Sequence, residues 1–283
     1  MGCSSSVPAP HTCHLAVHPQ YPARAPVKRL FWSEADAAYA PVRFTHAVVL
    51  EHDRTKHSTR ENGWADPAQW TPELEREVAS RPCLSTANGR VPMHSHRPRN
   101  PKGRTGMVER GLLGKYGPNI AADIVFLRTN SSTGRLQIIL IKRSDNGLWS
   151  LPGGMLDEAE SAFDCAKREF WEEALASQTL APELQAKLDL CLNQHKNGRE
   201  VYRGYVDDPR NTDWAWMETT AFLFYAEDEA LGELPVRGGD DAAEAKWVDF
   251  SNQDETFKHV NPAHREILSL VMKTEYFQNM KAW

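Results

Sequence analysis

The stretch from Pro152 to Ala174 places a glycine pair ahead of a glutamate-rich helical pattern. Apolar side chains recur in it at offsets of three and four residues: Ala162, Cys165, Ala166 and Phe170. Such a stripe predicts a helix over 161–174 that buries this face. On a neighbouring face, the helix would carry Glu169, Glu172 and Glu173 at positions i, i+3 and i+4. Side chains so spaced lie about 5–6 Å apart, so the sequence brings like charges together.

Three carboxylates this close repel one another unless a cation lies between them. Oxygen ligands favour hard ions, and Mg²⁺ or Mn²⁺ binds a few carboxylates while keeping water and phosphate as further ligands. We therefore predict a Mg²⁺ site, with Mn²⁺ as the alternative, at Glu169, Glu172 and Glu173. Arg168 can pair with Glu172 at i+4, and Gly153 lets the backbone approach a metal closely, which makes it a further candidate ligand. The plainer interpretation is a solvated acidic helix face.

The full spacing favours the metal site. Read from Gly154, it is a glycine, five residues, a glutamate, seven residues, Arg-Glu-Phe, one residue and a glutamate pair. This pattern closely resembles the Nudix box of hydrolases that act on nucleoside diphosphate derivatives. The resemblance implies an α+β fold, a Nudix-type α/β/α sandwich with a mixed sheet, and catalytic roles for Arg168, Glu172 and Glu173. Leu175 departs from the box, where a glycine is usual, but this position supplies no metal ligand.

Three further stretches resemble the ADP-ribose pyrophosphatase branch of that family, which is similar to the Nudix-like domain of melastatin-type channels. They read PRNPKGRTGMVERGLLGKYGPN, GYVDDPRNTDWAWMET and GDDA, and the resemblance runs from about residue 97 to the C-terminus. It implies that Asn100, Asp208 and Arg210 lie by the substrate, and Arg104 and Asn211 are candidates in the same stretches. On its own, DDPRN is typical of a structural turn.

Four other residues are weaker candidates for substrate contacts. Trp214 and Trp216 could stack on adenine, although a tryptophan that flanks a strand is more often part of the core. Glu218 opens a predicted strand and is a candidate site acid. His264, near the start of the last predicted helix, is either a surface or capping residue or an adenine contact.

Composition places the chain among globular proteins and excludes several function classes. Its 283 residues, 41% of them hydrophobic, can bury a large core. The net charge of −5 gives no basic field for nucleic acid. No apolar run approaches the roughly 20 residues that span a bilayer. The five cysteines are scattered without a CxxC pair, which favours a reducing compartment over a disulfide framework or a zinc site.

The chain divides into three parts. Residues 1–28 lack periodicity and predict a flexible tail, residues 29–116 a smaller N-terminal domain, and residues 117–283 the hydrolase-like domain. The Gly- and Arg-rich stretch 97–119, at the junction of the last two, is typical of a solvated linker, with phosphate contacts as the alternative.

Local patterns predict the main elements. Residues 39–52 indicate a strand region, and a helix is expected to start at Thr71 as N-cap and Pro72 as first residue. In the last part, we expect strands in DIVFLR, LQIILIKR, WMETTAFLFYA and AKWVDF, and helices in PELQAKLDLCLNQ and NPAHREILSLVMK. In the final helix, Leu268 and Val271 should face the core.

The chain opens with MGCSSS, which fits the pattern for myristoylation of Gly2 and places Cys3 beside it as a palmitoylation candidate. Two acyl chains would anchor a protein stably, whereas one gives marginal binding. The alternatives are an ordinary disordered start and an organelle transit segment, since no acidic residue precedes Glu34 but basic residues are few. We expect a cytoplasmic protein, membrane-anchored if acylated, and rank a mitochondrial location last.

Three functions fit these features. The first is Mg²⁺-dependent hydrolysis of ADP-ribose to AMP and ribose 5-phosphate, with Glu173, Asp240 or Asp241 taking the proton of the attacking water. The second is a non-catalytic ADP-ribose sensor, since channel-linked domains often lose glutamates of the box. The third is a Nudix hydrolase of another nucleoside diphosphate derivative. The box glutamates and Arg168 are all present here, which favours an enzyme.

Overall fold

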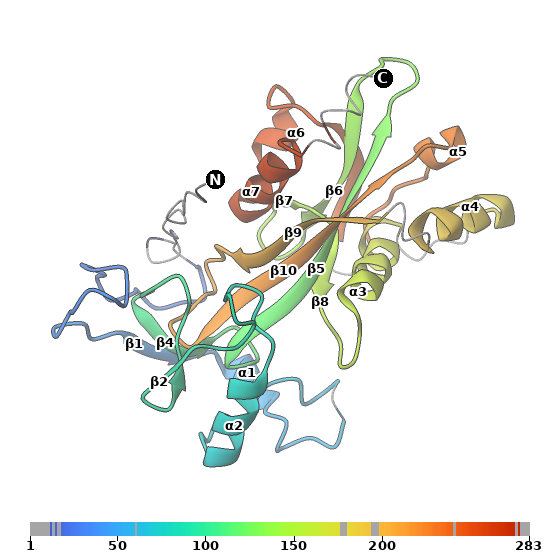
Figure 1. Ribbon diagram of the computed structural model, residues 1–283. Coiled ribbons are helices and arrows are strands. Elements are labelled where there is room, and N and C mark those ends of the chain that lie inside the picture. Colours follow the sequence, from blue (N-terminus) through green and yellow to red (C-terminus); the bar gives the residue numbers. More distant parts are fainter. Residues whose placement is uncertain are drawn as a thin grey trace. The chain divides into compact units, whose positions relative to one another are not determined.

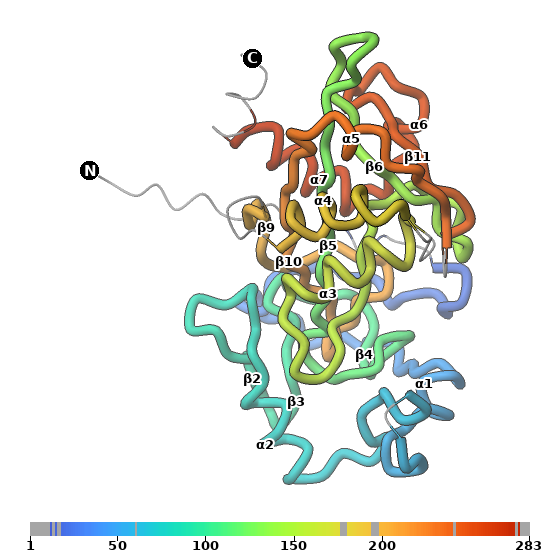
Figure 2. The backbone as a smooth tube through the Cα atoms, turned by 90° about the vertical axis from the view of Figure 1, so that its right-hand side faces the viewer, coloured from blue at the N-terminus to red at the C-terminus, as the bar shows by residue number. Residues whose placement is uncertain are grey.

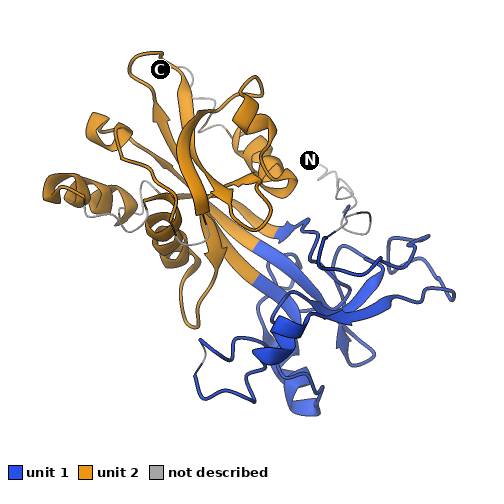
Figure 3. Ribbon diagram, turned by 180° about the vertical axis from the view of Figure 1, so that it is seen from behind, with its two compact units in different colours: residues 1–119, 205–218 blue, residues 120–204, 219–283 orange. Residues whose placement is uncertain are grey.

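The computed structural model describes residues 12, 15, 18–59, 61–175, 180–193, 198–239, 242–274 and 277. The chain separates into two compact units, coloured individually in Figure 3. Unit 1 comprises residues 1–119 and 205–218, and unit 2 comprises residues 120–204 and 219–283. Three strands contribute residues to both units: β5 (Gly117–Thr129), β9 (Arg199–Val206) and β10 (Ala215–Tyr225). Among the described residues, no helix is both long and apolar enough to cross a membrane.

A seven-stranded sheet forms the centre of the fold, in the order β11-β6-β5-β10-β9. Its other members are β6 (Leu136–Arg143), β11 (Ala242–Asp249), β7 (Trp149–Ser150), which pairs with β6, and β8 (Gly153–Met155), which pairs with β5. Strand β5 pairs antiparallel with β8, so that Asp123 lies opposite Gly153. The strands expected from the sequence of this part are confirmed.

Helices cover both faces of the sheet in unit 2. On one face lie α3 (Ala162–Glu169), the π-helix η1 (Phe170–Ala174) and α4 (Pro182–Asn193), as Figures 1 and 2 show. The other face carries α6 (Glu255–Lys258) and α7 (Pro262–Val271). The short α5 (Glu229–Gly232) lies near α4. The α+β sandwich with a mixed sheet, expected from the sequence, is confirmed.

The alternation of β5 explains the two layers. Ile124 and Phe126 join the cluster under α3 and α4, whereas Val125 and Leu127 join the cluster under α6 and α7, and all four are completely buried. Successive strand residues point to opposite faces, so one apolar run fills both cores. Helix α7 buries Leu268 and Val271, as its pattern predicts.

The acidic helix differs from its prediction in one respect. Ser161 caps α3 through its hydroxyl oxygen, which accepts from the Asp164 N–H at 3.1 Å. Cys165, Ala166 and Phe170 are buried as expected. The α-helix ends at Glu169, however, and the next turn is π-helical. A π-helical turn has more residues than an α-helical turn, so it changes the face of the helix on which each side chain lies. Such turns are frequent at functional sites.

Unit 1 contains mostly short elements. Strand β1 (Val42–Thr45) pairs in parallel with β4 (Met107–Gly111), and β2 (Met93–His94) forms a hairpin with β3 (Arg97–Pro98). Helices α1 (Ala47–Glu51) and α2 (Pro72–Ser80) complete it. The prediction of a cap at Thr71 is confirmed, because its Oγ1 accepts from the Leu74 N–H at 3.2 Å.

Three expectations for this unit need correction. The strand expected in residues 39–52 is present but short, because β1 ends at Thr45 and the His46 ring then accepts from the Val48 N–H and starts α1. Residues 97–119 are no solvated linker, since β3, β4 and the start of β5 lie there and most of the stretch is buried. The flexible tail does not reach residue 28: the Tyr21 hydroxyl donates to the Arg210 carbonyl and accepts from the Leu112 N–H.

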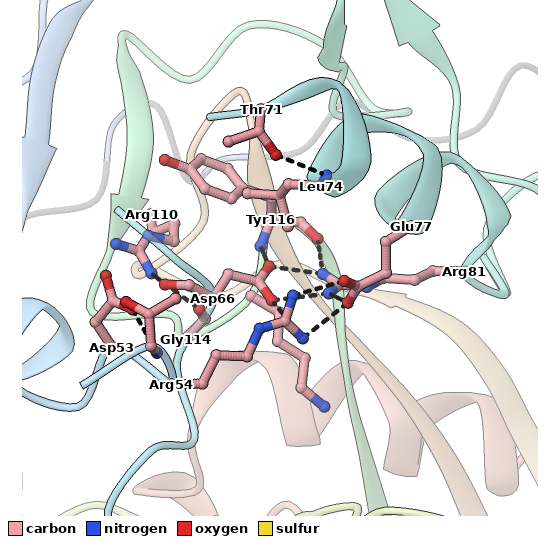
Figure 4. Close-up of polar contacts among 12 residues, drawn as sticks. Asp53, Arg54, Asp66, Thr71, Leu74, Glu77, Arg81, Arg110, Gly114 and Tyr116 are labelled. Atoms are coloured by element: carbon pink, nitrogen blue, oxygen red, sulfur yellow. Dashed lines mark hydrogen bonds and ion pairs between the residues drawn. The ribbon is translucent and has the colours of Figure 1, made fainter. Parts of the chain in front are cut away.

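A polar network, shown in Figure 4, joins α2 to the loops of unit 1. The buried Asp66 carboxylate accepts from both terminal nitrogens of Arg81 at 2.7 Å, and from the Tyr116 N–H at 2.8 Å. Glu77 accepts from Arg81 and from Arg54, each at 2.5 Å. Alternating charges at short range offset the desolvation of each buried group.

We expect Asp66→Asn to lower the free energy of unfolding by roughly 3 kcal/mol, because it removes the charge that balances a mostly buried guanidinium. Arg76→Gln is the control, since the Arg76–Glu73 pair is more than 70% exposed on both sides and such pairs contribute little. Urea titrations would measure both variants. Equal stability of the two would contradict this assignment.

Candidate active site

A single guanidinium holds three carboxylates at the glycine-flanked helix of unit 2. Arg168 Nε and Nη2 donate to the two oxygens of Glu160 at 2.9 and 3.0 Å. Its Nη1 donates to Glu169 at 2.7 Å and to Glu172 at 3.1 Å. The hydrogen bond from Arg168 lowers the pKa of Glu160. The pairing of Arg168 with Glu172 is therefore present, together with two contacts that helix spacing alone did not predict.

Glu173 points to the interior and avoids that guanidinium. Glu173 is only 4% exposed, and its Oε2 accepts from the Gly153 N–H at 2.9 Å. Burial raises the pKa of Glu173 to about 8, against the opposing hydrogen bond and with help from the charge of Glu169. Burial also raises the pKa of Glu169, although Arg168 opposes this. Two box carboxylates therefore lie where a negative charge is costly.

The two glycines are required by close approach. A Cβ atom on Gly154 would lie 2.3 Å from Glu169 Oε1, and one on Gly153 would lie 2.4 Å from Asp123 Oδ1. At Gly153 a Cβ would also lie 2.5 Å from the Ala122 carbonyl oxygen, so a side chain does not fit there, whereas at Gly154 the Glu169 carboxylate would have to move. The Gly153 position thus agrees with a role for its backbone near a bound cation.

The donor set suits a hard divalent cation. Glu169, Glu172 and Glu173 supply only oxygen atoms, and a cation nearby would favour the charged forms that burial disfavours. Among the described residues, no three His, Cys, Asp or Glu side chains are already grouped to hold a metal ion. Arg168 lies between two of the carboxylates instead, so a cation would have to share them with the arginine.

Asp123 is a site residue that the sequence reasoning missed. It is 5% exposed, its Oδ2 accepts from Thr219 Oγ1 at 2.6 Å, and its charge contributes to the raised pKa of Glu173. The signal was available, because Asp123 directly precedes the apolar run Ile124–Leu127, and burying an acid there has a cost that only a specific role offsets.

His264 and the GDD loop also belong to unit 2. The Leu151 N–H donates to His264 Nδ1 at 2.8 Å, and His264 Nε2 lies 3.9 Å from Asp123 Oδ1. The histidine is therefore held beside the box rather than at the surface. Asp240 and Asp241 lie outside the described residues. The preceding residue, Gly239, is described, and its N–H donates to the Glu173 carbonyl at 3.2 Å.

Four candidates in unit 1 have structural hydrogen bonds. Asn100 and Asn211 are fully buried, and both donate to the Tyr205 hydroxyl, at 3.2 and 2.9 Å. Arg104 donates to backbone carbonyls, including those of Arg29 and Phe31. The fully buried Glu218 accepts from Cys83 Sγ, the Leu84 N–H, the Ser85 N–H and hydroxyl, and Trp216 Nε1. A carboxylate with so many internal donors anchors a loop, so the structure gives Glu218 a structural role.

Asp208 and Arg210 form a bidentate pair with two contacts of 2.8 Å, and the Arg210 side chain is one-third exposed. Such a fixed guanidinium can present its remaining donors to an anion. The two tryptophans differ from each other. Trp216 is fully buried, in agreement with the core interpretation, whereas Trp214 is partly buried, and Arg43 and Arg97 lie over its ring.

Two family models match this chain: "NUDIX domain" over residues 117–271 and "NUDT9-like, N-terminal domain" over residues 25–117. The chain is 37% identical over 269 residues to a protein of Rattus norvegicus named mitochondrial ADP-ribose pyrophosphatase, covering 88% of this chain and 72% of that protein. It is 36% identical to putative nudix hydrolase 6 of Caenorhabditis elegans, covering 74% of this chain and 85% of that protein.

A transient receptor potential cation channel subfamily M member-like 2 of Nematostella vectensis is 34% identical over 86% of this chain, which spans 16% of the channel. Among solved structures, the NUDIX domain of Shewanella oneidensis NrtR with ADP-ribose is similar with a TM-score of 0.39. It is 17% identical and covers 55% of this chain and 87% of that domain. A score this low adds nothing to the assignment.

The raised pKa of Glu173 predicts pH-dependent metal binding. Without a cation, the Glu173 carboxyl keeps its proton below about pH 8, and a divalent ion must displace that proton. We expect Mn²⁺ to bind on the order of tenfold more tightly at about pH 8.5 than at about pH 6.5. Calorimetry on the metal-free protein measures this. Glu173→Gln should lose most of the pH dependence, and Glu183→Gln, an exposed acid on α4, should keep it. Equal affinity of the unmutated protein at both pH values would contradict the assignment.

Proposed function

Because the chain belongs to the Nudix hydrolase family and carries a NUDT9-like N-terminal domain, we propose that it hydrolyses ADP-ribose to AMP and ribose 5-phosphate. One observation carries this proposal: Arg168 organises Glu160, Glu169 and Glu172 while Glu173 lies buried beside Gly153. The name of the rat relative supports ADP-ribose as substrate.

We propose that Glu169, Glu172 and Glu173, with the Gly153 backbone, hold Mg²⁺, and that Mn²⁺ can replace it. When bound, such an ion neutralises phosphate charge and makes a nearby water more acidic. The fit rests on the all-oxygen donor set and on the close approach of the backbone at Gly153 and Gly154 to carboxylate oxygens.

The chain's own residues then have separate tasks. Arg168 fixes Glu169 and Glu172 in orientation, which keeps the charged oxygens in place before substrate arrives. We propose that the Glu173 carboxylate, once deprotonated, takes the proton of the attacking water, because its raised pKa makes it a stronger base than an ordinary glutamate. Asp240 and Asp241 are the alternatives. For the substrate's phosphate or ribose oxygens, we propose Asp208 and Arg210.

The test of catalysis is Glu173→Gln, which keeps side-chain volume but removes the charge. We expect kcat on ADP-ribose to fall by roughly 10²-fold or more, while the affinity for ADP-ribose in EDTA changes little. Steady-state kinetics and calorimetry measure the two quantities. Glu183→Gln should match the unmutated protein in both.

The alternative function is a sensor that binds ADP-ribose without cleaving it. An unmutated protein that binds ADP-ribose in the presence of Mg²⁺ but forms no product would establish this alternative. The intact box argues against it, because a sensor has no need of the buried and costly Glu173 carboxyl.

A second alternative keeps the chemistry and changes the substrate. To identify the preferred substrate, hydrolysis rates are measured on ADP-ribose, a dinucleotide, a nucleotide sugar and a capped RNA end. We expect the highest kcat/KM for ADP-ribose, and a higher value for any other member would change the proposed substrate.

For location, we propose import into mitochondria ahead of acylation, because the rat relative is named as mitochondrial. Gly2 and Cys3 lie outside the described residues, and no comparison supports their acylation. Fractionation of cells that contain the unmutated protein or Gly2→Ala distinguishes the two. Release of the variant from membranes would favour acylation, and an unchanged mitochondrial fraction of the variant would favour import.

A further inference from the structure

A cavity of about 260 Å³ lies within unit 1, beside the β2–β3 hairpin. Aromatic rings and guanidinium groups dominate its lining: Trp32, Tyr39, Trp214, Arg97 and Arg99, with the carboxyl of Asp213. These residues come from three separate parts of the chain, so only the folded unit assembles them. The proposed chemistry of the acidic helix uses none of them.

Several guanidinium groups lie in or near the cavity and make it positively charged. The guanidinium of Arg99 lies 4.6 Å from the centre of the Trp32 ring, and that of Arg104 lies 4.7 Å from the same centre. Arg97 lies 5.3 Å from the centre of the Trp214 ring. Arginine stacked on an aromatic ring stays planar and fixed, with its N–H groups directed outward from the edge.

The guanidinium of Arg104 has no carboxylate partner among the described residues. It is only 6% exposed, and its terminal nitrogens donate to the carbonyl oxygens of Arg29, Phe31 and Glu34. Its Nε is buried and has no hydrogen-bond partner. Carbonyl oxygens satisfy donors but do not neutralise a positive charge, so the field of Arg104 reaches its neighbours.

Arg99 is the cation that remains available. In the part of the chain that the structure describes, its guanidinium forms no ion pair and donates no hydrogen bond, and its contact is the stacking on Trp32. Burial and the neighbouring charge of Arg104 both lower the pKa of Arg99. The positive charges of Arg99 and Arg104 repel each other near the Trp32 ring, and a bound anion would relieve this repulsion. The acidic helix has the corresponding constraint with opposite sign, because its carboxylates repel one another.

The carboxyl of Asp213 does not supply that anion. Its Oδ1 accepts from the Thr105 N–H and hydroxyl at 2.7 and 2.8 Å, and its Oδ2 accepts from the Tyr39 hydroxyl at 2.7 Å. The charge of Asp213 acts on Arg99 in the opposite sense to that of Arg104, but the lining holds one carboxylate and the two guanidinium groups of Arg97 and Arg99, so the cavity stays electropositive.

We propose that this cavity is an accessory site for the phosphate group of a small phosphate ester, with Arg99 as its principal ligand and Arg97 as the second. Guanidinium forks match phosphate oxygens in a bidentate geometry. The volume is below the roughly 300–1,000 Å³ of pockets for drug-sized ligands, so it suits a sugar phosphate or free phosphate rather than a whole nucleoside diphosphate sugar. The site is additional to the acidic helix and does not depend on hydrolysis of ADP-ribose.

Calorimetry in EDTA tests this, because removing divalent ions eliminates any binding of phosphate to the acidic helix through a metal ion. Inorganic phosphate and ribose 5-phosphate are titrated into the unmutated protein and into Arg99→Gln. We expect at least roughly tenfold weaker binding of both in Arg99→Gln, because a charge-assisted fork is lost. Arg90→Gln is the control, since it removes an exposed arginine elsewhere in unit 1, and it should bind like the unmutated protein.

Three further comparisons make the outcome decisive. Arg97→Gln should weaken binding as well, which covers the case that Arg99→Gln unfolds, and thermal denaturation monitors folding of each variant. Glu173→Gln should keep full phosphate affinity, so a loss of hydrolysis and a loss of this site are separable.

Tighter binding of ribose 5-phosphate than of inorganic phosphate identifies the ester as the ligand, and equal binding identifies phosphate alone. No binding to the unmutated protein, or equal binding to Arg99→Gln, would overturn the proposal.

Discussion

The arrangement of the acidic helix depends on one guanidinium, that of Arg168, which lies among carboxylates. Arg168 contacts Glu160, Glu169 and Glu172, and a single positive charge cannot balance these three carboxylates. The excess negative charge is held in place by the fold, because the flanking strand, the glycine pair and the π-helical turn fix the positions of the carboxylates. An unbalanced group of carboxylates held in place by the fold is what the proposed divalent-cation site requires.

The same reasoning separates structural from functional charge elsewhere. In the network around Asp66, each charged group meets an opposite one at short range, so the cluster is closed and stabilises unit 1. Glu218 is likewise saturated by donors. Around Trp32 the balance is not closed, because Arg99 and Arg104 have no carboxylate partner among the described residues. Charge left unbalanced by the fold is what marks a site for an outside ligand.

The sequence predicted what depends on local periodicity and spacing. The apolar stripe through Cys165 and Ala166 located the acidic helix, and Thr71 located the start of α2. Contacts between distant segments were not predictable in this way. Glu218 meets donors more than 130 residues away, and Asp123 faces Gly153 only through strand pairing. The π-helical turn was missed as well, because the spacing of glutamates is the same for either helix type.

The measurement that tests the central claim most directly is identification of the products after incubation of the full chain with ADP-ribose, first with Mg²⁺ and then with EDTA. We predict AMP and ribose 5-phosphate with Mg²⁺ and intact ADP-ribose with EDTA. Intact ADP-ribose under both conditions, from a folded protein, would contradict it. Cleavage that continues in EDTA would show that the carboxylates around Arg168 do not act through a divalent ion.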